Sequence, residues 1–338
     1  MIPPWDVPLL GDLLWPLSQL YGLGLKARER LYGLGLLKEE GLPVPVVSVG
    51  NLTVGGSGKT PMVMALAKYF RGRGFKVAIL SRGYKGRAEA RGAVVSDGQR
   101  ILRGVEESGD EPQVLARALH GVMIAVGKDR LRMGQLVCQH FQPDLILLDD
   151  GFQYRGLKRD LDLLCLDLDT DLERPRLLPA GPFREPLSAI GRATAVILTY
   201  WRPSEKGERL REKALSWGKP LFLAPVRYEG LVRGGELFPL STLRGKKVSV
   251  LLGIAKPWRF LEALRGEGIE VLRVVIRGDH HWWEEREIGE AIKGAEAILT
   301  TEKDLVKLPD LDLPCYALRM SLEPEEAFWG FLESRLSG

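Results

Sequence analysis

The chain has 338 residues, of which 45% are hydrophobic and 27% are charged, and its formal net charge at pH 7 is +4. This composition is typical of a soluble globular protein with one or two domains, and the weak positive charge argues against a nucleic-acid partner while allowing an anionic ligand or a membrane surface. The three cysteines, Cys138, Cys165 and Cys315, are widely spaced, so they predict no disulfide framework and no metal site and indicate a reducing compartment. No apolar run reaches the roughly 20 residues of a membrane-spanning helix, and the N-terminus lacks the order of a signal peptide.

The first 40 residues contain a repeated apolar segment. The sequence Leu-Tyr-Gly-Leu-Gly-Leu occurs at 20–25 and again at 31–36. This shift is close to three helical turns, so both copies face the same way on a helix. Three basic residues, Lys26, Arg28 and Arg30, lie between them. The pattern fits an interfacial helix and a helix docked on the protein core equally well.

A glycine-rich loop joins a short apolar strand at 46–50 to a helix at 62–70. Glycines let backbone N–H groups turn toward a phosphate, and the helix N-terminus adds positive potential. We expect Lys59 to bridge the β- and γ-phosphates of a nucleotide and the Thr60 hydroxyl to hold Mg²⁺. The strict G-x-x-x-x-G-K-[ST] pattern has glycine where this chain has Thr53. The predicted nucleotide-binding residues of the loop are Asn51, Thr53, Gly55, Gly56, Ser57, Gly58, Lys59 and Thr60.

Apolar strands alternate with helices from residue 76 to residue 199. Such alternation predicts a parallel sheet with helices on both faces, as in P-loop NTPase-like α/β folds. The expected strands are 76–80, 93–96, 123–126, 144–150, 163–167 and 195–199. The expected helices are 108–120 and 130–141.

The pattern changes near residue 216, where two extended segments precede a second run of strands and helices. The extended segments are 222–226 and 231–238, and the strands after them are 248–252, 269–276, 297–299 and 315–318. We therefore expect a smaller C-terminal α/β domain that closes over the active site. The predicted division is an N-terminal helical segment at 1–40, a nucleotide-binding core at 41–215 and the smaller domain at 216–338.

Acidic residues stand at the ends of two predicted elements. Asp149 and Asp150 end a buried apolar strand, which is where phosphate-loop enzymes hold Mg²⁺. The alternative is a simple turn, because Asp-Gly is a turn dipeptide. Asp110 and Glu111 begin a predicted helix, and acidic residues in a first turn also stabilise a helix without any catalytic role.

Nine short segments occur in a specific order along most of the chain. They are 51–61, 80–84, 109–112, 127–130, 149–153, 178–186, 253–255, 279–280 and 300–304. Together these segments resemble the tetraacyldisaccharide 4′-kinase family, the lipid A 4′-kinases of Gram-negative bacteria. The resemblance runs from about Leu20 to Leu308, and the loop of that family also lacks the first Walker glycine.

The resemblance implies a kinase that uses ATP and Mg²⁺ to phosphorylate the 4′-hydroxyl of a tetraacyldisaccharide 1-phosphate, a lipid A precursor. It also implies a cytoplasmic protein in peripheral contact with the inner face of the inner membrane. We expect a monomer with no nucleic-acid partner.

The resemblance further implies roles for individual residues. Asp110 is the expected base for the sugar hydroxyl, His280 its partner, and Glu111 a ligand of Mg²⁺ or of its waters. His281, next to His280, is alternatively part of a packed aromatic turn. We expect Thr301 and Asp304 to cap a helix, with contact to the site left open. The basic residues that are candidates for phosphate binding, each also compatible with a solvated surface position, are Arg82, Lys128, Arg130 and Arg184.

Two other functions compete with this interpretation. One is a regulatory or metal-delivery P-loop NTPase, although residues 301–304 have the wrong spacing for the base-reading segment of a GTPase. The other is a peripheral membrane protein whose nucleotide site serves only regulation. Turnover of a lipid A precursor separates this second alternative from a kinase.

Overall fold

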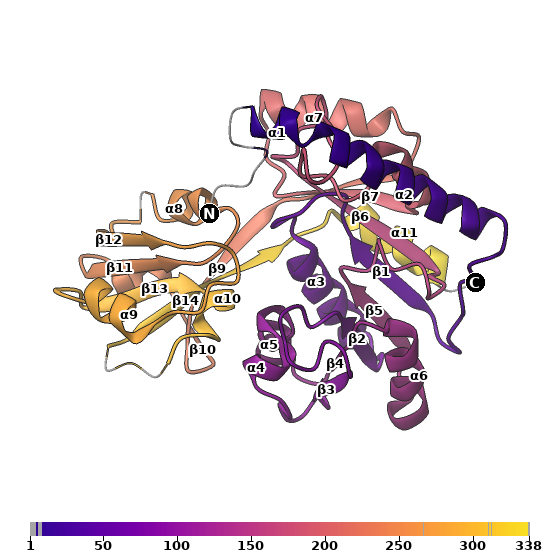
Figure 1. Cartoon of the computed structure of the whole chain (residues 1–338). Helices are drawn as coiled ribbons and strands as arrows, with labels where there is room; N and C mark the ends of the chain where they lie inside the picture. The colour runs from indigo at the N-terminus through magenta and orange to yellow at the C-terminus, as the bar shows by residue number, and fades with distance from the viewer. Residues whose placement is uncertain (1–4, 6–8, 266, 310, 312, 337–338) are drawn as a thin grey trace.

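The computed structural model describes residues 5, 9–265, 267–309, 311 and 313–336. Two β-sheets, each with its own helices, lie side by side and are joined by a ribbon of two long strands (Figure 1). These strands are β9 (Val226–Arg233) and β14 (Cys315–Leu322), which pair in antiparallel orientation.

The first sheet has eight strands in the order β3-β4-β2-β5-β1-β6-β7-β8, and all neighbours are parallel except β3 and β4. Its strands are β1 (Val46–Gly50), β2 (Val77–Ser81), β3 (Ala93–Ser96), β4 (Met123–Val126), β5 (Leu145–Asp149), β6 (Leu161–Asp167), β7 (Ala195–Thr199) and β8 (Leu221–Ala224). Its helices are α3 (Lys59–Gly72), α4 (Val105–Ser108), α5 (Asp110–Ala118), α6 (Arg130–Phe141), α7 (Glu205–Leu215) and α11 (Glu326–Leu336).

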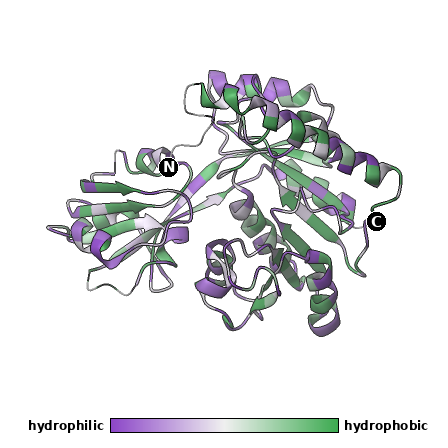
Figure 2. Cartoon of the chain, viewed as in Figure 1, coloured by the Kyte–Doolittle hydropathy of each residue, from purple (hydrophilic) through white to green (hydrophobic). Residues whose placement is uncertain are grey.

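Helices cover both faces of this sheet. Val47 and Val49 of β1 belong to the core shared with α3, α5 and α11, whereas Val46 belongs to the core shared with α6. Adjacent residues of a strand point to opposite faces, so a strand buried on both faces is apolar throughout. Figure 2 shows this as hydrophobic strands flanked by helices of mixed hydropathy. The predicted P-loop NTPase-like α/β fold is confirmed.

The second sheet has six strands in the order β10-β9-β14-β13-β11-β12. Its remaining strands are β10 (Glu236–Phe238), β11 (Lys247–Leu252), β12 (Glu270–Ile276) and β13 (Ala297–Thr301). Its helices are α8 (Pro257–Ala263), α9 (Glu285–Ala291) and α10 (Glu302–Leu305). The strands β11 to β14 are mutually parallel, so the predicted second α/β unit is present.

The chain changes sheet between β8 and β9. Strand β8 extends the first sheet through β7, and α11 returns to the first core, where Phe328 and Leu332 are fully buried. Both elements lie beyond residue 215. The division into 1–40, 41–215 and 216–338 stays a prediction. Beyond residue 215 the chain first completes the first sheet with β8, then forms the second sheet with β9 to β14, and finally returns to the first core with α11.

The N-terminal segment forms α1 (Leu10–Leu13) and α2 (Trp15–Gly33), which lie across the first unit (Figure 1). Polar side chains attach α2 to the protein: the Tyr21 hydroxyl donates to the Arg184 carbonyl at 2.7 Å, and Arg28 donates to Glu185 at 2.8 Å. Several leucines of this segment are exposed, namely Leu13, Leu17, Leu20, Leu23, Leu31 and Leu34. The helix is therefore docked and still presents apolar side chains to solvent. None of the described helices is both long and apolar enough to cross a bilayer.

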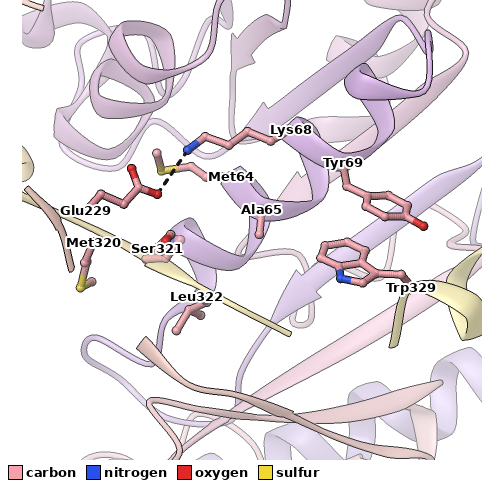
Figure 3. A pocket seen from close by; sticks show the side chains of 10 residues that line it. Met64, Ala65, Lys68, Tyr69, Glu229, Met320, Ser321, Leu322 and Trp329 are labelled. Atoms are coloured by element: carbon pink, nitrogen blue, oxygen red, sulfur yellow. Dashed lines mark ion pairs between the residues drawn. The ribbon is translucent and has the colours of Figure 1, made fainter. Parts of the chain in front are cut away.

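A cavity of about 410 Å³ lies where the ribbon passes α3 (Figure 3). Lys68 of α3 and Glu229 of β9 form an ion pair beside it, with 3.8 Å between Nζ and Oε1. Leu322 lines the cavity, and its Cδ1 lies 3.2 Å from where a Cβ on Gly58 would stand. The junction of the two units thus touches the last glycine of the phosphate loop.

Candidate active site

The loop between β1 and α3 turns through two glycines with left-handed backbones. Gly55 has φ 96° and Gly58 has φ 79°, which side chains other than glycine rarely adopt. Helix α3 begins at Lys59, so its free N–H groups face the loop. This is the backbone that a phosphate site requires.

Thr53 differs from the glycine of the strict motif for a structural reason. It forms an isolated antiparallel bridge with Phe183, and the Val54 N–H donates to the Pro182 carbonyl at 2.9 Å. Among the described residues, Thr53 is not one of those that have a positive φ. A position in such a bridge needs no glycine. The backbone contacts with residues 182 and 183 therefore hold this part of the loop in place.

A ring of polar contacts connects the loop to the end of β5. Asn51 Nδ2 donates to Ser57 Oγ at 2.5 Å, and Lys59 Nζ lies 3.5 Å from Ser57 Oγ and 3.6 Å from Asp150 Oδ1. Arg184 donates twice to Asp150, each at 2.8 Å, and also to Asn51 Oδ1. Burial acts to raise the pKa of Asp150, but Lys59 and Arg184 hold it well below its usual range. The ring concentrates positive charge next to the phosphate loop.

Asp149 has the opposite environment. It is buried, its Oδ1 has no hydrogen-bond partner among the described residues, and Ser81 Oγ donates to its Oδ2 at 3.4 Å. Burial, Glu111 and Asp150 raise the pKa of Asp149 to about 7. A buried carboxylate with an unused oxygen fits a cation ligand.

The donor set suits Mg²⁺ bound together with a nucleotide. Within the described ranges, no group of three His, Cys, Asp or Glu side chains is arranged to hold a metal by itself. Mg²⁺ needs fewer protein ligands, because it keeps waters and takes phosphate oxygens. Asp149 and the Thr60 hydroxyl are then the fitting ligands, whereas Asp150 is already held by Arg184. Glu111 stays a candidate beside them.

Mg²⁺ affinity in the presence of ADP should fall on acidification below pH 7. Since the pKa of Asp149 is raised to about 7, its carboxylate takes up a proton there, and each further pH unit costs about tenfold in metal affinity. Without the cation, the Asp149 carboxyl binds more protons in the folded protein than in the unfolded chain between about pH 4 and 7, so the contribution of Asp149 to stability should fall as pH rises through that window. Titration calorimetry at fixed ADP between pH 6 and 8 measures the affinity.

The Asp149→Asn variant is the control for this titration, because it keeps the titration of the nucleotide itself. We expect weaker Mg²⁺ binding in this variant, with a flatter dependence on pH. The same pH dependence in the variant and the native protein would contradict the role of Asp149.

Asp110 and His280 meet across the boundary between the two units. His280 Nδ1 lies 2.8 Å from Oδ2 and 3.1 Å from Oδ1 of Asp110, and His280 has a left-handed φ of 62°. Burial acts to raise the pKa of Asp110, but the hydrogen bond from His280 and the charge of Lys303 lower it to about 2. At neutral pH the carboxylate is ionised and only accepts, so His280 Nδ1 carries the hydrogen.

Lys303 lies on the other side of the imidazole. Its Nζ is 2.8 Å from Asp279 Oδ1, 3.3 Å from Glu111 Oε1 and 3.4 Å from His280 Nε2. An ammonium only donates, so His280 Nε2 is the accepting nitrogen. These contacts favour a hydrogen on Nδ1 and a lone pair on Nε2 that faces Lys303.

The other basic candidates lie in different environments. Arg82 is half exposed and donates to Glu89 at 2.6 Å, and Lys128 is exposed. Arg130 is buried against Tyr154, with its guanidinium carbon 5.0 Å from the ring centroid. Arg130 Nε has no hydrogen-bond partner among the described residues, so Arg130 fits an anion better than the other two.

The structure decides two alternatives that the sequence leaves open. His281 Nε2 lies 2.8 Å from Glu287 Oε2, and its ring packs edge-on against Trp283 at 5.1 Å between centroids, which is the packed aromatic turn. Thr301 Oγ1 accepts from the Asp304 N–H at 3.0 Å, so the predicted cap of α10 is confirmed.

Sequence reasoning missed two residues of this cluster. Lys303 lies inside the segment 300–304, yet only its neighbours Thr301 and Asp304 stood out as a capping pattern. Lys307 lies four residues further on, and that spacing places both lysines on one side of a helical turn. Their spacing, combined with the acidic pair Asp110 and Glu111, was the available signal.

Comparisons with known proteins point to one family. A sequence model of the family described as tetraacyldisaccharide-1-P 4′-kinase matches residues 10–337. The chain is 41% identical over 312 residues to the tetraacyldisaccharide 4′-kinase of Pelobacter propionicus, covering 90% of this chain and 85% of that protein. It is 40% identical over 324 residues to that of Geobacter sulfurreducens, covering 94% and 90%.

A solved structure agrees with the sequence matches. The crystal structure of an "apo" form LpxK from Aquifex aeolicus in complex with ATP superposes with a TM-score of 0.80 at 36% identity. The superposition covers 97% of this chain and 98% of that protein.

Proposed function

This chain belongs to the tetraacyldisaccharide-1-P 4′-kinase family, and we propose that it acts through the residues described above. It is a kinase that transfers the γ-phosphate of ATP to the 4′-hydroxyl of a tetraacyldisaccharide 1-phosphate in lipid A biosynthesis. The assignment of residues rests on one observation: the Asp110–His280 pair lies close to the phosphate loop and the end of β5. Glu111, next to Asp110, acts electrostatically on both Asp149 and Arg184 at the phosphate loop.

The phosphate loop and its cations hold the transferred group. Phosphoryl transfer depends on positioning and on neutralising charge more than on covalent help. Lys59 and the N–H groups at the start of α3 bind the phosphates. Arg184 neutralises Asp150, so the ion pair between Asp150 and Lys59 competes less with phosphate binding. Mg²⁺, when bound at Asp149 and Thr60, neutralises charge on the phosphate oxygens.

The carboxylate–imidazole pair takes the proton of the sugar hydroxyl. As the new bond from the 4′-oxygen to phosphorus forms and the bond to the ADP oxygen breaks, the proton passes to His280 Nε2. Asp110 stays ionised, holds Nδ1–H and stabilises the imidazolium. With its pKa lowered to about 2, Asp110 is a weak base, which favours His280 as the acceptor.

The N-terminal helix suits a lipid substrate at a membrane surface. Its exposed leucines give an apolar face, and Tyr21 and Arg28 tie it to Arg184 and Glu185 beside the phosphate loop. A helix that rests on the inner face of the inner membrane would bring the site to the headgroup of the substrate. Within the same proposal the protein acts as a monomer, because one chain supplies each site residue named here.

Exposed leucines of α2, and Leu34, the residue that follows it, should control binding to vesicles. Leu20→Ser, Leu23→Ser and Leu34→Ser combined should weaken binding to phosphatidylglycerol-containing vesicles by about tenfold or more. Lys26→Gln with Arg30→Gln should also weaken it, by about 1 kcal/mol per charge at low salt and less at high salt. Cosedimentation with vesicles measures both effects.

Two controls keep this test specific. Arg28 is left unchanged, because it pairs with Glu185, which is 2% exposed, and its loss would disturb the docking of α2. Leu237→Ser changes a leucine of the second unit that is 53% exposed and should leave vesicle binding unaltered. Unchanged cosedimentation of the α2 variants would leave α2 as a docked helix only.

The experiment that tests the function is transfer of labelled phosphate from ATP to a purified tetraacyldisaccharide 1-phosphate in mixed micelles. A labelled lipid product is the expected result. Hydrolysis of ATP without labelled lipid would contradict the kinase and favour a regulatory NTPase.

A further inference from the structure

Lys307 is a buried charged residue without a role in the reaction outlined above. It follows α10, and its side chain is 1% exposed. Burying an ammonium is costly unless charges compensate it. The charged groups around Lys307 therefore indicate its role.

Two carboxylates compensate Lys307, one from each structural unit. Its Nζ lies 3.2 Å from Asp304 Oδ1 in its own unit and 3.5 Å from Asp110 Oδ2 in the first unit. Lys307 and Asp304 together thus reach the carboxylate that orients His280.

Asp304 is a rigid anchor. It is fully buried, and its carboxylate accepts from the Gly253 N–H at 2.9 Å, from Trp283 Nε1 at 3.3 Å and from Thr301 Oγ1 at 2.9 Å. A carboxylate held by three donors has little freedom to turn. Lys307 lies beside it as an ion-pair partner whose Nζ has no hydrogen-bond partner among the described residues, so burial and the two carboxylates hold its charge in place.

Lys307 does not reach the reacting atoms. The cavity that it lines together with Tyr84, Asp110 and His280 has a volume of about 10 Å³, too small for a sugar. Lys303, by contrast, is partly exposed and contacts His280 Nε2. Both lysines approach the same carboxylate oxygen, since Lys303 Nζ lies 4.0 Å from Asp110 Oδ2, but of the two Lys303 is the one that also contacts His280 Nε2.

We propose that Lys307 is a positioning residue: it couples Asp110 to the Asp304 anchor across the boundary between the units and so fixes the orientation of His280. This inference rests on the proposed function of Asp110 and His280. It predicts that the pair is aligned only while the second unit is seated against α5.

Replacement of Lys307 by methionine, which keeps the length and removes the charge, tests the inference. We expect Lys307→Met to lower kcat by about 10–100-fold while KM for ATP and for lipid changes by about twofold or less. In the Asp110→Asn background the same replacement should cause no further loss, because Lys307 acts only through that carboxylate.

A matched control separates positioning from stability. Val250→Ala removes buried volume from β11 in the same unit, away from the site, and should lower Tm without lowering kcat once the protein is folded. If Lys307→Met loses kcat only in proportion to its loss of Tm, or if its effect multiplies with that of Asp110→Asn, the inference is overturned.

A spectroscopic readout distinguishes failure of this inference from failure of the proposed function. The Nδ1–H proton of His280 should give a downfield NMR signal in the native protein, which Lys307→Met should shift or broaden. If the native protein transfers no phosphate to lipid, the proposed function fails, and this signal still tests the coupling. An unchanged signal together with an unchanged kcat in Lys307→Met would overturn the coupling alone.

Discussion

Lys59→Ala should lower kcat by about 10³-fold or more and leave the protein folded. Lys59 is the first residue of α3, and its Nζ is held between Ser57 and Asp150, 3.5 Å and 3.6 Å away. Nothing else in the loop carries a mobile positive charge to the transferred phosphate. Its removal also takes from Asp150 one of the two ion pairs that the described residues make with it, so the ring next to the phosphates loses a cation.

Lys68→Ala is the matched control, because it truncates another lysine of α3, which is 46% exposed and whose ion pair among the described residues is with Glu229 across the junction cavity. We expect near-native kcat for this variant and native circular dichroism for both. Near-native turnover of a folded Lys59→Ala protein would refute the assignment of the loop.

Asp110→Ala and His280→Ala should each lower kcat by about 10²–10⁴-fold, with little change in ATP affinity. The two side chains act as one unit through the Nδ1 contact at 2.8 Å, so the double variant should be barely slower than the worse single variant. Steady-state kinetics on lipid and ATP, combined with nucleotide binding by calorimetry, measure both effects. Multiplicative losses in the double variant would show that the residues act independently.

Asp110→Asn should be measured together with Asp110→Ala, to separate a loss of activity from a loss of stability. Asp110→Ala leaves Lys307 and Lys303 with one fewer counter-charge in a buried cluster, which costs stability as well as activity. The asparagine keeps the shape of the side chain. A normal kcat for His280→Ala would remove His280 from the reaction and leave it as a residue packed against Tyr84.

Most of the fold could be predicted from the sequence, because the apolar strands of a parallel sheet and the glycine loop are local patterns. The predicted strands correspond closely to β1 to β7 and to β11 to β14, and the family resemblance is confirmed. The return of α11 to the first core escaped the sequence, since it depends on contacts with residues more than 200 positions away, such as Tyr69 with Trp329.

The site was less accessible than the fold for the same physical reason. Asp110 and His280 were paired through the family motif and do lie together, although their roles stay a proposal. The low pKa of Asp110 and the raised pKa of Asp149 arise from burial and from neighbours in other segments, which no local pattern encodes. Lys307 was missed as a site residue, because its partner Asp110 lies on another structural unit and the spacing to Lys303 is only a weak signal.

The most direct test compares phosphate transfer to the tetraacyldisaccharide 1-phosphate with transfer to its 4′-deoxy analogue under identical conditions. A 4′-kinase activity predicts a product with one additional phosphate from the first lipid and none from the second, with ADP formed in equal amount to the product. Phosphorylation of the 4′-deoxy analogue, or no phosphorylation of either lipid by a protein that binds ATP, would contradict it.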